Sequence, residues 1–202
     1  DDKNSSILHN GVDSNMFNKN NYEMKSDKKE IIFVGNLKRF NKERGVEFLI
    51  DSFLNSDFLK KHTLSIVGGP NGEAEKIRNK ISSLNLGDNI KVIGRVHRSE
   101  ISNIYKNAKL GILINSSTNL HSYKYTSPLK YFEYIYSGLR VVAVDFPSHR
   151  VLPGNENIIF FEENNNLSFE KAIKKAMELP VNIDQSMSDI SLDNRAKKIL
   201  NL

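Results

Sequence analysis

The residues best suited to binding a charged ligand lie within 125–134. Ser127 is a favourable helix N-cap and Pro128 a favourable first helical residue, so a helix is predicted to begin here. The free N–H groups of its first turn and the charge of Lys130 favour an anion such as a diphosphate. Glu133 follows on the same helix face and can accept hydrogen bonds from the two hydroxyls of a ribose. The same spacing also fits a Lys–Glu pair on the surface of an amphipathic helix.

A second candidate anion site is the basic loop that runs from Gly35 to Gly45 between a predicted strand and a predicted helix. It carries four basic residues, Lys38, Arg39, Lys42 and Arg44. A helix N-terminus attracts negative charge, and arginine can hold a phosphate through two parallel hydrogen bonds. The spacing matches neither the Walker phosphate loop nor the GxGxxG dinucleotide motif. A surface loop with solvated basic residues is the alternative interpretation.

A glycine-rich turn, Gly68-Gly69-Pro70-Asn71-Gly72, follows the next predicted strand. Glycine lets the backbone pass close to a ligand, because it has no Cβ atom. A tight turn without a ligand explains the same residues equally well.

Strands that alternate with helices must position these loops. Short β-branched runs, typical of strands buried on both faces, predict strands at 31–34, 64–67, 90–93, 110–114, 141–144 and 158–161. Apolar residues at helical spacing predict helices at 46–54, 73–84, 99–108, 128–137, 169–179 and 194–202. This alternation predicts an α/β fold: a Rossmann-like, mostly parallel sheet with helices on both faces. Ligands of such sheets bind at the carboxyl ends of the strands, where the loops described above lie.

The composition excludes several kinds of chemistry. The 202 residues include no cysteine, so disulfides, thiolate catalysis and cysteine-ligated metals are excluded. The five histidines show no paired metal-ligand spacing, and no apolar run approaches the roughly 18 residues that span a bilayer. The formal charge of +5 favours anionic partners, but the basic residues are spread along the chain as expected for a solvated surface.

Six segments, in order along nearly the whole chain, resemble the C-terminal, donor-binding domain of a retaining GT-B glycosyltransferase of the GT4 type. They are residues 7–17, 33–45, 67–70, 92–96, 127–145 and 194–200. The most specific is the stretch that begins Ser127-Pro128-Leu129-Lys130 and continues through Glu133. The resemblance implies three parts: an interdomain connecting segment (1–28), a Rossmann-like nucleotide-sugar-binding domain (29–180) and a C-terminal tail with a closing helix (181–202).

The resemblance also implies roles for individual residues. Arg44 and Lys130 would be catalytic, because they would neutralise the departing diphosphate. Glu133 would bind the ribose hydroxyls, and Val96 would hold the nucleobase through backbone contacts. The full set expected to bind the donor is Gly35, Asn36, Arg39, Gly69, Val96, Tyr125, Thr126, Ser127, Pro128, Leu129 and Glu133. The family needs no metal and no cofactor, and its donor substrate is a nucleoside diphosphate sugar, more often UDP-linked than GDP-linked.

The sequence departs from the family pattern at three positions. The family often has Gly-Arg after the first strand and Lys-Gly before the first helix, where this chain has Gly35-Asn36 and Arg44-Gly45. Many members also carry two glutamates separated by seven residues; Glu133 would be the second, and Tyr125 occupies the position of the first. The basic residue that meets the phosphates and the contact to the sugar are therefore left open.

We expect the chain to be the donor-binding half of a hexosyltransferase, with little or no transfer activity by itself. The N-terminal domain of the same protein would bring the glycan or lipid-linked acceptor. We expect a cytoplasmic protein, with the full enzyme associating peripherally with the inner face of the membrane and with no nucleic acid as partner. The alternatives are another GT-B-shaped enzyme, such as a sugar-nucleotide epimerase or a phosphorylase, and a non-catalytic Rossmann-like binding module.

Without that second domain, two parts of the chain should lack packing partners. Residues 1–28 and the apolar residues Ile199, Leu200 and Leu202 of the closing helix are therefore expected to be exposed or disordered.

Overall fold

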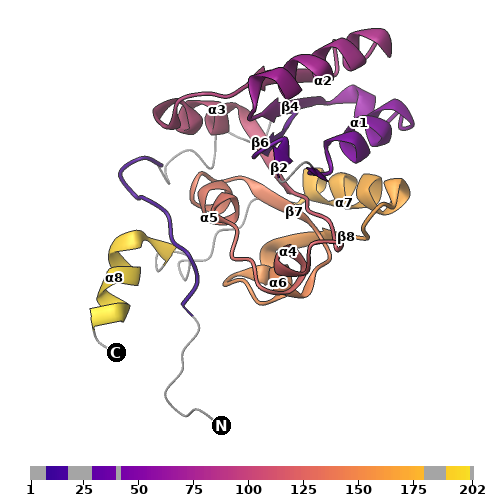
Figure 1. The fold of residues 1–202 in the computed structure, drawn as a ribbon. Coiled ribbons are helices and arrows are strands. Elements are labelled where there is room, and N and C mark those ends of the chain that lie inside the picture. The colour runs from indigo at the N-terminus through magenta and orange to yellow at the C-terminus, as the bar shows by residue number, and fades with distance from the viewer. Residues whose placement is uncertain (1–7, 18–28, 40–41, 180–189, 201–202) are drawn as a thin grey trace.

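A sheet of six strands, all parallel, forms the centre of this computed structural model, which describes residues 8–17, 29–39, 42–179 and 190–200 (Figure 1). Its strand order is β5-β4-β1-β6-β7-β8. The bounds in that order are Ile90–Gly94, Thr63–Val67, Glu30–Val34, Ala108–Leu113, Arg140–Val144 and Ile158–Phe161. The predicted α/β class with a parallel sheet is confirmed.

The strand order reverses beside β1. From β1 the chain adds β4 and β5 on one side, then returns to place β6, β7 and β8 on the other. Val34, the last residue of β1, pairs with Val67 at the end of β4, and Phe33 pairs with Ile112 near the end of β6. The loops that leave these three strands therefore open into the crevice where α/β sheets bind ligands.

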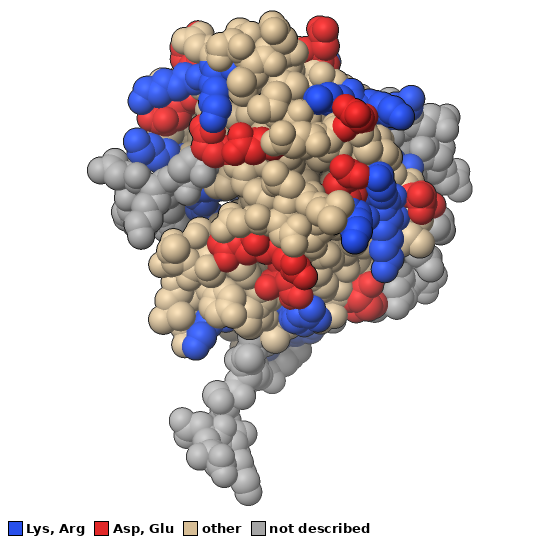
Figure 2. Space-filling view, turned by 90° about the vertical axis from the view of Figure 1, so that its right-hand side faces the viewer, with Lys and Arg blue, Asp and Glu red and all other residues tan. Residues whose placement is uncertain are grey.

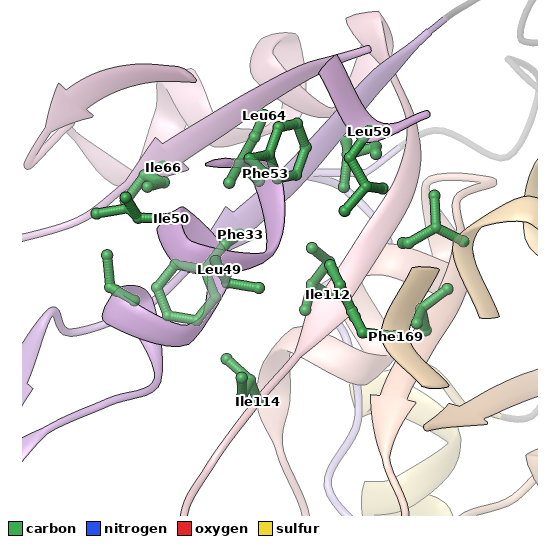
Figure 3. Close-up of a cluster of buried hydrophobic side chains, with 14 of the residues drawn as sticks. Phe33, Leu49, Ile50, Phe53, Leu59, Leu64, Ile66, Ile112, Ile114 and Phe169 are labelled. Carbon is green, nitrogen blue, oxygen red and sulfur yellow. The ribbon is translucent and has the colours of Figure 1, made fainter. Parts of the chain in front are cut away.

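Alternating side chains bury both faces of the sheet. Ile31 and Phe33 point to one face, which is covered by α1 (Val46–Leu54), α2 (Asn71–Ser83) and α7 (Asn166–Glu178). Figure 3 shows this cluster, in which side chains of α1 meet those of the strands. Ile32 and Val34 point to the other face, which is covered by α3 (Ile101–Asn107) and α5 (Leu129–Tyr136).

Helix α1 forms where its apolar periodicity predicts it. Val46, Leu49, Ile50 and Phe53 make the expected stripe, and each is at most 1% exposed. The residue before the helix, Gly45, has a φ of 83°, which only glycine adopts readily. The loop after β1 therefore turns into α1 at a position that requires glycine.

A single tyrosine ties α5 to the middle of the sheet. A Cβ atom at Gly111 in β6 would lie 2.4 Å from the ring of Tyr134, so this strand position must be glycine for the ring to lie against it. The hydroxyl of Tyr134 then reaches β1 and accepts a hydrogen bond of 2.9 Å from the N–H of Val34. This contact fixes the distance between α5 and the end of β1.

Several short elements were not predicted from the sequence. Strands β2 (Lys38–Arg39) and β3 (Lys42–Glu43) form a small antiparallel hairpin in the basic loop. The other elements are α4 (Leu120–Lys124), α6 (Pro147–Arg150) and the 3-10 turns η3 (Leu59–Lys61) and η5 (Asn155–Asn157), whereas the turn η4 (Arg98–Glu100) forms the start of the helix predicted at 99–108. Each is too short to show a repeating apolar pattern.

The expectation that residues 1–28 lack packing is wrong for the described part, 8–17. Val12 and Phe17 are only 2% and 3% exposed, and Val12 forms a parallel bridge with Ser191 just before α8 (Leu192–Leu200). Figure 1 shows this N-terminal segment beside α8 at one edge of the molecule. Apolar side chains of α8 do remain exposed, with Leu200 at 84%, while Leu202 lies outside the described residues.

The surface carries charges of both signs. Figure 2 shows one face, on which Lys and Arg side chains lie interspersed with Asp and Glu. Two of these basic residues have acidic neighbours: Lys60 lies 3.7 Å from Asp57, and Lys174 lies 2.5 Å from Glu170. Among the residues that the structure describes, no helix is long and apolar enough to cross a membrane.

The buried His149 of α6 makes folding stability sensitive to acid. Its side chain is fully buried, its Nδ1 lies 2.8 Å from the carbonyl oxygen of Val144, and burial lowers its pKa below the ordinary 6.5. The unfolded chain therefore binds a proton as the pH falls below about 6.5, whereas the folded chain resists protonation, so stability is lost in that direction. Between pH 7.5 and pH 5.5, the free energy of unfolding should fall less in the variant His149→Phe than in the wild type. Equal losses in urea titrations would assign the acid sensitivity to other groups.

Candidate functional site

A cleft of about 830 Å³ opens at the carboxyl ends of β1 and β4. Its wall comes from three stretches and three single residues: 34–36, 67–70 and 95–98, with Lys38, Ile101 and Lys130. The volume lies in the range of pockets that hold small molecules and cofactors. The cleft also adjoins the reversal of strand order, where ligands of α/β sheets are found.

The floor of the cleft is built from backbone. The N–H of Gly35 donates to the carbonyl of Val67 at 3.0 Å, and the N–H of Gly68 donates to the carbonyl of Gly94 at 2.8 Å. Gly68 has a φ of 153°, and a Cβ atom there would lie 1.7 Å from the carbonyl oxygen of Gly35. The loops after β1 and β4 therefore meet so closely that no side chain fits at Gly68.

The rim of the cleft is basic. The lining includes Lys38, Arg95, His97, Arg98 and Lys130, and none of the described lining residues is acidic. Lys38 faces one nearby carboxylate, that of Glu73, at 3.6 Å. Cationic side chains that converge on a cleft concentrate anions within it. Arg95 and Arg98 were not singled out from the sequence, because their shared position depends on the turn after β5.

The start of α5 differs from the prediction. The helix begins at Leu129, and Pro128, predicted as the first helical residue, has the extended backbone of an N-cap. Ser127, predicted as the N-cap, instead binds Asn10: its Oγ accepts the Asn10 N–H at 3.1 Å, and its carbonyl oxygen accepts Nδ2 at 2.6 Å. These bonds engage Ser127 away from the helix end, so the prediction of a serine cap is wrong.

Lys130 and Glu133 do pair, but not as a surface pair. Lys130 Nζ donates to Glu133 Oε2 at 2.7 Å, and the side chains are 31% and 8% exposed. Lys130 lines the cleft, whereas Glu133 stands directly behind it. The same carboxylate oxygen accepts a hydrogen bond of 2.8 Å from the hydroxyl of Tyr105 in α3. The sequence did not point to Tyr105, because it lies in a different helix.

The predicted catalytic residue Arg44 is not part of the cleft lining. Its guanidinium donates to the side-chain oxygen of Asn115, which follows β6. Asn115 and Gly45 line a separate cavity of about 440 Å³, together with Glu47 and Asp51. The side chain of Arg39 lies outside what the structure describes.

The structure thus brings together some of the predicted catalytic and donor-binding residues. Gly35, Asn36, Gly69, Val96 and Lys130 line one cleft. Residues 125–129 and Glu133 are not among its described lining residues. Tyr125 and Leu129 are 69% and 51% exposed, and their contact with the donor stays a prediction.

The chain's sequence matches the family Glycosyl transferases group 1 over residues 15–196. The chain belongs to this family. No curated protein sequence gives a significant match.

Solved glycosyltransferase structures share the fold at low sequence identity. A glycosyltransferase from Rickettsia africae ESF-5 is 16% identical, with a TM-score of 0.72 over 100% of this chain and 57% of that one. Anabaena Alr3699/HepE, solved with UDP and glucose, is 16% identical, with a TM-score of 0.70 over 97% of this chain and 55% of that one. The chain therefore spans about half the length of these two proteins.

A third structure matches the chain in size as well. The C-terminal domain of the glycosyl transferase group 1 family protein LpcC from Francisella tularensis is 17% identical, with a TM-score of 0.59. The match covers 95% of this chain and 97% of that one. The expected fold, that of the C-terminal domain of a GT-B glycosyltransferase, is confirmed.

The contact between Gly68 and Gly35 can be tested with two alanine variants. Gly68→Ala should destabilise the chain by more than about 1 kcal/mol, because the methyl group collides with backbone and the φ angle disfavours it. Gly72→Ala is the matched control, since Gly72 lies in the first turn of α2 with nothing within 4 Å of the added atom. It should leave stability unchanged or raise it slightly. Equal melting temperatures for the two variants would show that the loops after β1 and β4 can move apart without loss of stability.

Proposed function

We propose that the cleft binds the nucleoside diphosphate sugar of a retaining glycosyltransferase that transfers a hexose-type sugar to a glycan or glycoconjugate acceptor. The observation that carries this proposal is the convergence of basic side chains over a floor of backbone at the ends of β1 and β4. Membership of the glycosyl transferases group 1 family supports the reaction class. The first amide groups of α5 add partial positive charge near Lys130.

In the proposed reaction, negative charge develops on the leaving group. The bond between the anomeric carbon and the phosphate oxygen breaks, and its electron pair goes to the diphosphate. The acceptor hydroxyl forms the new bond on the same face of the sugar and gives its proton to an oxygen of the departing diphosphate. Fixed cations stabilise the charge that develops on the diphosphate. We assign this role to Lys130, whose ammonium retains donors beyond the one that Glu133 accepts.

Arg44 would act differently from Lys130. Its guanidinium donates to Asn115 outside the cleft lining, so the side chain has to move to contact a phosphate bound in the cleft. We propose that side-chain cations do the work that a metal ion does in other transferases, and that no cofactor takes part. The transfer activity of the protein with its further domain should then be unchanged by EDTA.

The donor is proposed to be UDP-linked. Anabaena Alr3699/HepE was solved with UDP and with glucose, and two further similar structures, TarM and GtfA, were solved with UDP. Because the chain spans about half the length of its first structural matches, we propose that a further domain supplies the acceptor site and that transfer needs both.

Thermal unfolding with UDP, GDP, ADP and CMP tests the donor assignment. A ligand at about 100 times its dissociation constant adds roughly 2.7 kcal/mol, which is a rise of roughly 5–10 °C for a chain of this size. We expect that rise with UDP. If none of the four nucleotides raises the melting temperature, the cleft is not a nucleotide site, and a non-catalytic binding module becomes the better interpretation. If UDP-sugar is bound but turned over without an acceptor, an epimerase is favoured instead.

Glu133 is proposed to receive the ribose hydroxyls, so Glu133→Ala should weaken UDP binding. Losing hydrogen bonds to a charged group costs about 1.5–3 kcal/mol, or roughly 10- to 150-fold in affinity. Calorimetric titration measures the change. Glu178→Ala, at an exposed position near the end of α7, is the control and should bind UDP as the wild type does. Unchanged affinity in the Glu133 variant would remove the ribose assignment.

A further inference from the structure

Tyr105 is a buried polar residue to which the proposed reaction gives no role. It lies in α3, its side chain is 0% exposed, and its hydroxyl contacts Glu133 Oε2 at 2.8 Å across 28 residues of sequence. Burial raises the pKa of Tyr105 well above its usual value. The phenol therefore keeps its proton at neutral pH, and it is the donor in this bond.

The two donors to Glu133 converge on one oxygen. Lys130 Nζ and Tyr105 Oη both reach Oε2, at 2.7 and 2.8 Å. Within the described chain, no donor contacts Oε1. Two charge-assisted hydrogen bonds from different helices fix the plane of a carboxylate more firmly than the one from Lys130 alone. They occupy Oε2 and not Oε1.

The ring of Tyr105 is held on both sides. Phe17, from the N-terminal segment, stacks on it with ring centroids 5.8 Å apart. Tyr134, from α5, meets it edge-on at 5.3 Å. Tyr134 is itself tied to the end of β1 through its hydroxyl. The donor atom of Tyr105 is therefore placed by the same packing that places α5 against the sheet.

Lys130 alone would be a poorer support for this carboxylate. It lines the cleft and is proposed to meet the diphosphate, so its ammonium must serve two anionic groups. Its flexible side chain is also 31% exposed, whereas the phenol of Tyr105 is rigid and buried. The rigid hydrogen bond is the one that can keep Glu133 in place when Lys130 turns to a phosphate.

We propose that Tyr105 is a positioning residue of the ribose subsite, which holds the Glu133 carboxylate so that Oε1 is left for the ribose hydroxyls of the donor. This inference rests on the proposed donor site. It differs from a purely structural role in one measurable respect: removing the Tyr105 hydroxyl should change how strongly the chain distinguishes a ribose from a sugar without those hydroxyls.

The test is the ratio of dissociation constants for 2′,3′-dideoxyuridine diphosphate and UDP, measured by calorimetry on the chain. In Tyr105→Phe the ring keeps its contacts with Phe17 and Tyr134, so the variant should fold, which circular dichroism checks. We expect UDP affinity to fall about 3- to 10-fold, with little change for the dideoxy compound, so the ratio shrinks. Tyr105→Leu removes the ring contacts together with the hydroxyl, so it serves as a second variant for the ratio only if it melts as the wild type does.

Tyr131→Phe is the matched control. Tyr131 is also a fully buried tyrosine, and its hydroxyl donates to the carbonyl of Pro153 at 2.6 Å, away from Glu133. Its loss should lower the melting temperature without changing the ratio. Glu133→Gln should shrink the ratio, and adding Tyr105→Phe to it should shrink the ratio little further, because coupled residues are not additive.

The outcomes separate the two proposals. A wild-type chain that binds neither nucleotide contradicts the donor site, and the role of Tyr105 with it. A wild-type chain that prefers UDP, with a ratio that falls in Glu133→Gln but not in Tyr105→Phe, overturns the positioning role and leaves the donor site standing.

Discussion

The passage of Gly68 against the carbonyl oxygen of Gly35 is the contact on which the cleft depends. It brings the loops after β1 and β4 to van der Waals distance, and the Gly68–Gly94 hydrogen bond adds the turn after β5. Parallel strands in register end at the same edge of the sheet, so their loops compete for the same space. Because glycine has no side chain, the two loops can lie against each other. Their backbone then forms the floor of the cleft, and charged side chains surround it.

Helix α5 carries Lys130 and Glu133, and its position is fixed by Tyr134. The ring of Tyr134 lies over Gly111 of β6, and its hydroxyl reaches β1. That anchor places Lys130 on the wall of the cleft and Glu133 behind it. A charge pair that looks like a surface feature in the sequence is thereby turned inward. Burial then requires partners for the carboxylate, and Lys130 and Tyr105 supply them.

The N-terminal segment contributes to the same region. Asn10 binds Ser127 just before α5, and Phe17 stacks on Tyr105. The segment is held in turn by the bridge between Val12 and Ser191. Residues expected to be a loose connection therefore support the helices that carry the candidate site. The exposed apolar residues of α8, by contrast, agree with the sequence-based expectation.

The sequence by itself determined the alternation of strands and helices, since burial on both faces of the strands and one-sided burial of a helix such as α1 leave regular apolar patterns. It also located the glycine-rich loops and Lys130. Only the tertiary structure decided where Ser127, Arg44 and Tyr105 turn their polar atoms. Their partners lie far away in the chain: 117 residues for Ser127, 71 for Arg44 and 28 for Tyr105. A polar side chain takes the partner that packing brings within about 3 Å, and no local pattern encodes that choice.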